Sequence, residues 1–126
     1  KSTGNACRNS ARSSPEVGPT NFFLLAGSQS PEEIIDQVEG GLYVTGLQGV
    51  HSGANQISGQ FSVGATGLWI EKGKLTHPIR EVTIAGEMLT MLQDIDAVGS
   101  DFRFFPLDGN FGSATIRLRK MTIAGK

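Results

Sequence analysis

The sequence predicts an α+β domain built mainly from antiparallel β-sheet, barrel-like or sandwich-like, with two short-to-medium helices. Glycine supplies 17 of the 126 residues and charged residues only 18%, which favours a turn-rich, strand-rich domain over a helical bundle. Between residues 42 and 84, aromatic and β-branched residues alternate with small polar ones, a pattern typical of antiparallel strands. A chain of this length is sufficient for one domain with its own core.

The chain divides into an arm and a globular part. Residues 1–20 are small and polar, with two prolines and no periodic apolar face, which predicts an irregular arm or linker. Residues 21–126 are expected to form the domain. Its first apolar run, residues 22–25, predicts a short strand buried on both faces.

Two segments have helical patterns. The first helix is expected to begin after Ser30, because Ser30 suits the N-cap, Pro31 the first helical position, and Glu33 the capping box. It should end at the glycine pair at residues 40–41. Methionines, leucines and other apolar residues at spacings of one, three and four predict a second, amphipathic helix over residues 86–98.

The remaining apolar runs predict strands. The expected segments are residues 42–45, 56–70, 75–84, 102–105, 114–119 and 121–124. In the long second strand, Gly59, Gly64 and Gly67 interrupt the pattern, which indicates bulges, bends or the close approach of another chain. Pro78 restricts the third strand to a sheet edge or a bulge.

Charge and cysteine content narrow the class of function. Eleven Lys and Arg against 12 Asp and Glu give a formal charge of −1, so the sequence has no electrostatic signature of direct nucleic-acid binding. No apolar run reaches the roughly 20 residues that span a bilayer, and no secretory signal is recognisable, so we expect a soluble protein that does not contact a membrane. The single cysteine, Cys7, predicts a reducing, cytoplasmic setting.

No catalytic or metal-binding pattern is complete within the chain. His51 and His77 have no cysteine or histidine nearby at ligand spacing, and Cys7 has no histidine within forty residues. The glycine-rich stretches fit neither a P-loop nor a dinucleotide fingerprint. We therefore predict no catalytic residue, no metal ligand and no bound cofactor in this segment.

Several phrases in a fixed order carry a family resemblance. They are STGNA at residues 2–6, GPTNF at 18–22, GLYVT at 41–45, GQFSVGATG at 59–67, IEKG at 70–73, EVTIAG at 81–86 and MTIAG at 121–125. Together they resemble the carboxy-terminal domain of the TldD/PmbA family, with greater similarity to the PmbA branch, also called TldE and long labelled a modulator of DNA gyrase. The resemblance covers nearly the whole chain.

The resemblance implies a cytoplasmic zinc-dependent peptidase, a hydrolase, that assembles from two related subunits, matures modified peptide precursors and degrades unfolded peptides. In the catalytic TldD branch, histidines from an upstream motif and a late cysteine hold the zinc. Residues 109–114 of this chain contain no cysteine, and Cys7 lies too early to replace it. Gln60 and Glu87 also depart from the residues usual in the branch. The resemblance therefore implies a partner subunit that supplies fold, interface and substrate surface.

Glycines that admit another backbone suit a wall on which an extended peptide adds as a strand. On this hypothesis the peptide tunnel or the subunit interface is lined by a short set of residues: Gly59, Phe61, Ser62, Gly64 and Gly67. Alternatively, the glycines only shape the sheet. Two alternatives stay open for the parent protein: a self-sufficient homodimeric zinc peptidase with an upstream histidine motif, or a protein-interaction module as the gyrase label suggests.

Overall fold

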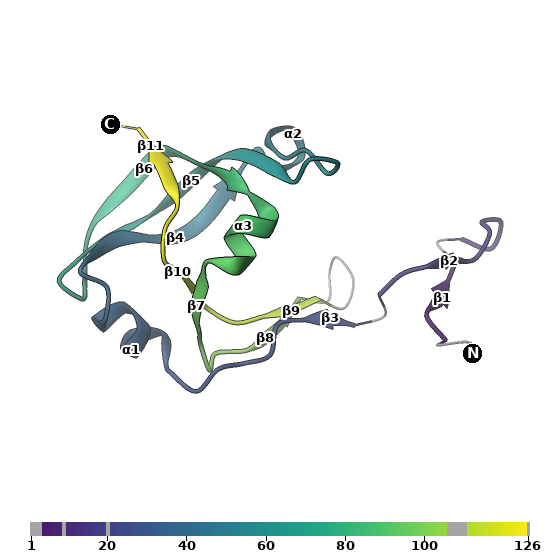
Figure 1. The fold of residues 1–126 in the computed structure, drawn as a ribbon, viewed down its shortest axis with the longest axis horizontal. Coiled ribbons are helices and arrows are strands. Elements are labelled where there is room, and N and C mark those ends of the chain that lie inside the picture. The colour runs from purple at the N-terminus through teal and green to yellow at the C-terminus, as the bar shows by residue number, and fades with distance from the viewer. Residues whose placement is uncertain (1–3, 9, 20, 106–110, 126) are drawn as a thin grey trace.

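The computed structural model describes residues 4–8, 10–19, 21–105 and 111–125, which form eleven strands and three short helices (Figure 1). In chain order the elements are β1 Ala6–Cys7, β2 Glu16–Val17, β3 Phe22–Phe23, α1 Pro31–Asp36, β4 Gly40–Gln48, α2 Val50–Gly53, β5 Gln60–Glu71, β6 Lys74–Glu87, α3 Met88–Gln93, β7 Ile95–Val98, β8 Arg103–Phe105, β9 Phe111–Ser113, β10 Ile116–Leu118 and β11 Thr122–Ala124. The predicted fold class is confirmed. The described strands form four sheets, none of which closes into a barrel.

The largest sheet is antiparallel and has the order β11-β6-β5-β4. Its centre is the β5–β6 hairpin, closed by Lys72 and Gly73 between the paired residues Glu71 and Lys74. Both turn residues have positive φ, 49° and 74°, the geometry of a two-residue turn that matches strand twist. The turn packs on the end of α1, where Gly73 N–H donates to the Val38 carbonyl at 2.8 Å.

The hydrophobic core lies on one face of this sheet. Its buried residues come from the two central strands: Val63, Ala65, Val82 and Ile84. Along each strand these positions are two residues apart, so the alternation that predicts strands also predicts which side chains turn inward. Leu42, Phe61, Ile79 and Met121 cover the cluster in part.

Three register shifts bend the large sheet near Thr66. One adds a residue to β4 at Thr45, and two add residues to β6, on either side of Pro78. Glu81, in one of these bulges, has a φ of 58°, which is unusual for a residue other than glycine. On the outer side of β6, β11 pairs only with residues 83–85. Among the described residues, no strand therefore lies beside Pro78 on that side of β6. The expected place of Pro78 at an edge or bulge is confirmed.

The two predicted helices exist, but the second is shorter than expected. In α1, Ser30 Oγ accepts from the Glu33 N–H at 3.2 Å and the Glu33 carboxylate accepts from the Ser30 N–H at 2.7 Å, so the capping box is confirmed. The prediction of helix up to Val98 is wrong, because α3 ends at Gln93 and the chain continues as β7, paired with β10. The one-turn helix α2 has no counterpart among the predicted elements.

A second, smaller sheet has the order β3-β9-β8, with β3 parallel to β9 and β9 antiparallel to β8. The expected strand at residues 22–25 is only two residues long here, and the prediction that it is buried on both faces is wrong. Phe22 and Phe23 are 65% and 46% exposed. Both side chains belong to a sheet of three short strands. No second layer from the described part of the chain covers this sheet.

The amino-terminal arm contains one ordered feature within the region expected to be irregular. β1 and β2 pair as a short antiparallel ladder, and the Gly18 N–H donates to the Asn5 carbonyl at 3.1 Å. Figure 1 shows this pair standing away from the rest of the molecule, beyond β3.

Candidate functional site

The five residues predicted to line a peptide or subunit surface lie along β5 and the turn before it, and four of them line two separate hollows. Phe61 and Ser62 line a hollow at the start of β5, with a volume of about 830 Å³, which we call the β5-start cleft. Gly64 and Gly67 line a second hollow of about 600 Å³ at the sheet bulges, which we call the bulge hollow. Gly59 belongs to the turn that borders the first.

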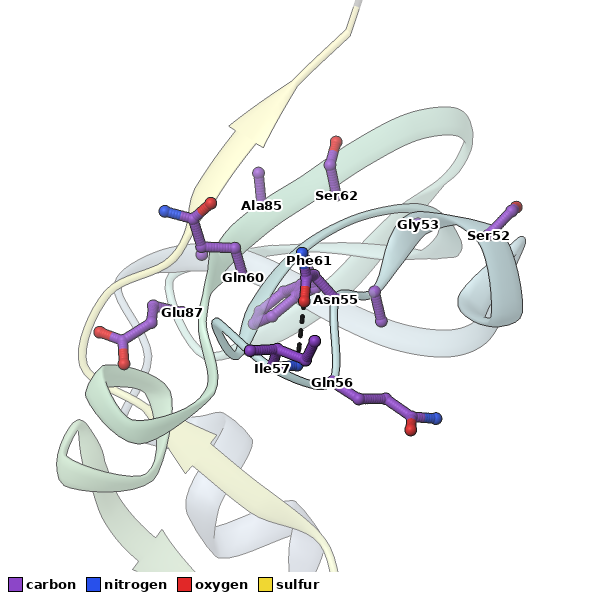
Figure 2. Close-up of a pocket in the computed structure, with 12 residues that line it drawn as sticks. Ser52, Gly53, Asn55, Gln56, Ile57, Gln60, Phe61, Ser62, Ala85 and Glu87 are labelled. Carbon is purple, nitrogen blue, oxygen red and sulfur yellow. Dashed lines mark hydrogen bonds between the residues drawn. The ribbon is translucent and has the colours of Figure 1, made fainter.

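The β5-start cleft is bounded by a loop that is held in place by its own hydrogen bonds. The Asn55 side-chain oxygen accepts from the N–H groups of Ile57 and Ser58 at 2.9 and 3.1 Å, and the Asn55 N–H donates to the Gln60 carbonyl at 2.8 Å. Figure 2 shows Phe61 beneath this loop, with Ile57 at the rim. Ile57 is fully exposed, so an apolar side chain stands at the mouth of the cleft.

The side chains of this cleft suit binding rather than bond cleavage. Half of its lining residues carry amide, hydroxyl or aromatic groups, most of the others are small or apolar, and Glu87 is its one carboxylate. The Glu87 carboxylate accepts a 2.7 Å hydrogen bond from the Thr90 hydroxyl, which holds it at the start of α3. Among the described lining residues no nucleophile is paired with a general base, the arrangement that covalent catalysis requires.

The three predicted glycines differ in their local roles. A Cβ on Gly67 would overlap the carbonyl oxygen of Tyr43 on β4, so this glycine lets β4 approach β5. Gly59 has a φ of 72°, which favours glycine whatever the space. At Gly64 a Cβ would lie 3.4 Å from the Gln48 Cβ, an ordinary contact. Gly64 is therefore the position at which a side chain can probe the surface without disturbing the sheet.

The charged side chains with the most hydrogen-bond partners lie elsewhere, around β7 and β10. Arg117 Nε and Nη2 donate to the two carboxylate oxygens of Asp96 at 2.8 and 3.2 Å, and Nη1 donates to the Gln37 side chain at 3.0 Å. The hydrogen bonds from Arg117 lower the pKa of Asp96. These groups join β7, β10 and the end of α1.

Asp101 makes the equivalent connection between the segments that flank the small sheet. Its carboxylate accepts from the Thr115 N–H at 2.9 Å and from the Thr115 hydroxyl at 2.8 Å. The hydrogen bond from the Thr115 backbone is the main cause that lowers the pKa of Asp101. Both aspartates are thus engaged in holding strands, which accounts for them without acid–base chemistry.

The described residues do not fit a metal site. No group of three or more His, Cys, Asp or Glu side chains gathers within residues 4–8, 10–19, 21–105 and 111–125. His77 Nδ1 lies 3.2 Å from the Thr76 hydroxyl, and Cys7 is exposed on β1. In the same ranges, no helix is long and apolar enough to cross a membrane.

The feature that sequence reasoning missed is the amount of uncovered apolar surface. The chain exposes 9501 Å² of polar and apolar surface together, its projecting arm included, whereas a compact monomer of 13.4 kDa exposes about 6,500 Å². Phenylalanines of the small sheet contribute, with Phe104 and Phe105 53% and 55% exposed, and so does α3, where Leu89 is 65% exposed. The FRFF run at residues 102–105 was a signal, because adjacent phenylalanines in one strand point to opposite faces.

Comparison with known proteins gives this surface a context. Residues 1–125 match the family described as the PmbA/TldA metallopeptidase C-terminal domain, and the chain belongs to that family. It is 34% identical over 116 residues to metalloprotease PmbA of Escherichia coli O157:H7, covering 91% of this chain and 25% of that protein.

Solved structures agree on the fold. TldE from Thermococcus kodakarensis aligns over 99% of this chain and 28% of its own, with a TM-score of 0.87 and 30% identity. A Thermotoga maritima protein, described as a candidate modulator of a DNA gyrase, aligns over 86% of this chain and 24% of its own, with a TM-score of 0.79 and 32% identity. The chain thus spans about a quarter of the length of the relatives it matches.

Proposed function

We propose that this chain is the carboxy-terminal domain of a PmbA/TldE-like subunit in a cytoplasmic, zinc-dependent peptidase complex that processes or degrades unfolded peptides. In this proposal the domain provides fold, subunit contacts and substrate surface, and the zinc ligands come from a related TldD-type subunit. Family membership and the likeness to TldE support the class of protein. Neither nucleic acid nor membrane has a part in the proposal.

The observation that carries the proposal is the uncovered apolar surface. The exposed area exceeds that of a compact monomer of this mass by about 3,000 Å². A standard protein–protein interface removes about 800 Å² from each partner. The projecting arm supplies part of this excess, and the exposed side chains of the small sheet and of α3, among them Phe104, Phe105 and Leu89, supply apolar area for contacts with other parts of a subunit assembly.

The substrate part of the proposal rests on the two hollows along β5. Phe61 and Ser62 offer an aromatic ring and a hydroxyl in the β5-start cleft, and Gly64 leaves the bulge hollow open beside the sheet. β5 pairs with β4 and with β6, so a peptide cannot add to it as a further strand. In this proposal the peptide lies across the face of the sheet, where the absence of a side chain at Gly64 lets its backbone approach. Gly59 and Gly67 then act indirectly, by shaping the turn and the β4–β5 approach.

Zinc stoichiometry tests the assignment of the zinc ligands. The full-length parent is purified alone, without added metal and beside a chelator-treated control, and analysed for its elements. We expect no tightly bound zinc, with peptide cleavage appearing only when a zinc-bearing TldD-type relative is added. About one zinc per chain would instead make the parent a metallopeptidase subunit in its own right.

Substitution at Gly64 tests the substrate surface. We expect Gly64→Val to reduce peptide cleavage by the assembled complex several-fold while the circular dichroism spectrum stays unchanged, because the added side chain fills the bulge hollow. Leu75→Val, at a 41% exposed position of β6 that lines neither hollow, serves as the matched control. Cleavage equal to wild type in the folded Gly64 variant would remove the bulge hollow from the substrate path.

A further inference from the structure

The small sheet carries exposed phenylalanines on both of its faces. On one face, the register aligns Phe22, Phe111 and Phe105 across the three strands, and these side chains are 65%, 43% and 55% exposed. On the other face, Phe23 and Phe104 are 46% and 53% exposed. Strands with one solvated face alternate apolar and polar residues, whereas strands covered on both faces are apolar throughout. The small sheet therefore has the side chains of an inner layer.

The pairing of the small sheet also requires a covering layer. Among the strands of the described residues, β3 and β9 are the one parallel pair. Parallel pairs occur almost only in sheets that are covered on both faces. The three strands have only two or three residues each, and a sheet of this size is not stable without packing on another layer. Both faces are thus expected to contact another part of the molecule.

The amino-terminal arm indicates which part of the molecule this is. Pairing of β1 with β2 brings Asn5 beside Gly18, whose N–H donates to the Asn5 carbonyl at 3.1 Å. Gly18 lies four residues before Phe22, a separation of at most about 14 Å. The chain spans about a quarter of the length of its relatives, and the matched family is a carboxy-terminal domain. In the proposed parent, the preceding chain therefore enters this domain beside the small sheet.

The area of the two faces also favours a covalently connected partner. A phenylalanine side chain buries about 150–250 Å², so five rings that are about half exposed leave about 500 Å² uncovered. A separate protein partner usually covers about 800 Å² on each side, and one that sits on a single face would reach only part of these rings. A connected segment binds at a high effective concentration and can pack on both faces.

We propose that the preceding part of the parent chain packs on both faces of the small sheet, so that β3, β9 and β8 become an inner layer of the subunit. The inference rests on the proposed function only in that the parent is a longer chain that ends in this domain. It requires neither a second copy nor a TldD-type subunit. It also accounts for the apolar run at residues 22–25, which is typical of a strand buried on both faces.

Hydroxyl-radical footprinting of the unmodified full-length parent tests the burial. The parent is purified alone, and oxidation of Phe22, Phe104 and Phe105 is measured by mass spectrometry relative to the unfolded parent, at a low and a high protein concentration. The exposure of these rings in this domain corresponds to about half of the unfolded rate. We expect a rate at least tenfold below the unfolded rate at both concentrations, as for Val63 in the core.

The other possible occupants predict different results. Protection that appears only at the high concentration would assign the faces to a second copy. Protection that appears only after addition of a TldD-type relative would assign them to the partner subunit. Either result overturns the inference, and so do rings that oxidise at about half of the unfolded rate in every condition. The zinc and cleavage tests do not depend on these outcomes, so the proposed function can stand or fail separately.

Charged substitutions provide the second measurement. Phe104→Asp and Phe105→Asp place a carboxylate on opposite faces of the sheet. Water solvates a carboxylate at a half-exposed position, whereas a covering layer would bury it without a partner. We expect each variant to lower the thermal midpoint of the full-length parent by at least about 5 °C. Leu75→Asp, at a 41% exposed position of the large sheet, is the matched control and should lower it by less than half as much.

The three midpoints decide between one covered face, two and none. Equal shifts for all three variants overturn the inference, because the small sheet would then be no better covered than the control position. A shift confined to one of the two phenylalanines contradicts the covering of both faces. If a variant does not fold, footprinting still decides, since it needs no substitution.

Discussion

The large sheet and the small phenylalanine-rich sheet have similar apolar sequences but different surroundings. Four of the seven buried hydrophobic residues form the cluster on β5 and β6, whereas β3, β8 and β9 contribute none to the core. The difference shows that an apolar run predicts a need for burial, while the number of packed layers decides whether that need is met inside the chain. The large sheet meets it on one face, and the small sheet does not.

The phenylalanines of the small sheet are nevertheless organised. Phe23, Phe102 and Phe104 form edge-to-face pairs with ring centroids 5.0–5.9 Å apart, and Phe22 contacts Phe111 at 6.2 Å. Because neighbours in a strand point to opposite faces, these are two clusters, one on each side of the sheet. Within these clusters the side chains of Phe22, Phe23 and Phe104 are about half exposed or more. Such pairs contribute about 0.5–1.5 kcal/mol each, so the small sheet has order without a core.

The largest expected effect concerns the closest approach inside the large sheet. Gly67→Ala should destabilise the protein by about 3 kcal/mol or more, since the added Cβ overlaps the Tyr43 carbonyl and must separate β4 from β5. Gly64→Ala, three residues earlier on the same strand, should change stability by less than about 1 kcal/mol. Urea unfolding of both variants measures the difference. Equal losses would mean that the β4–β5 approach does not depend on Gly67.

A smaller effect compares the two sheets directly. Val63→Ala removes buried methyl groups from the core and should cost about 2 kcal/mol, whereas Phe104→Ala, on a half-exposed ring, should cost about 1 kcal/mol in this 126-residue chain. In the longer parent, covering of the small sheet should raise the Phe104 loss to about 3 kcal/mol and leave the Val63 loss unchanged. The measurement is urea unfolding of both variants in both lengths. A Phe104 loss that does not depend on length would show that nothing else covers this sheet.

The same contrast explains what the sequence could predict. Local signals succeeded where the cause is local: Ser30 and Glu33 make their capping box, and the gap between the strands expected at residues 56–70 and 75–84 holds the hairpin turn at Lys72 and Gly73. The second helix was extended too far because Ile95 and Val98 fit a helical face as well as a strand. Pairing with β10, a partner distant in sequence, decided between them.

The candidate site was predictable only in part, for a related reason. Interruption of the strand by glycines indicated close approach, and Gly67 does meet another backbone. That this backbone is Tyr43 of the neighbouring strand could not be derived from spacing, because it depends on the register shift at Thr45. The exposure of the phenylalanines could not be predicted either. It depends on whether a second layer covers the small sheet, and the sequence pattern of one strand does not encode that.

The smallest expected effect lies in the β7–β10 pair, whose strands connect the two sheets in sequence on either side of β8 and β9 (Figure 1). Asp96 and Asp101 both have a lowered pKa in the folded chain, relative to an ordinary value of 3.8. Their stabilisation is therefore complete above about pH 4 and is lost as the pH falls through the folded pKa, because the unfolded chain takes up protons first. Each contributes about 1 kcal/mol or less, as expected for a pair that water still reaches.

The double variant Asp96→Asn and Asp101→Asn isolates this contribution. At pH 7 it should be less stable than wild type by about 1 kcal/mol or less, and the difference should shrink as the pH is lowered from 4 towards 2. Urea unfolding across this range, with Glu32→Gln at an exposed position of α1 as the control, measures it. A difference that stays constant with pH would show that the aspartates stabilise the connection through shape rather than charge, and the two sheets would then be joined by packing alone.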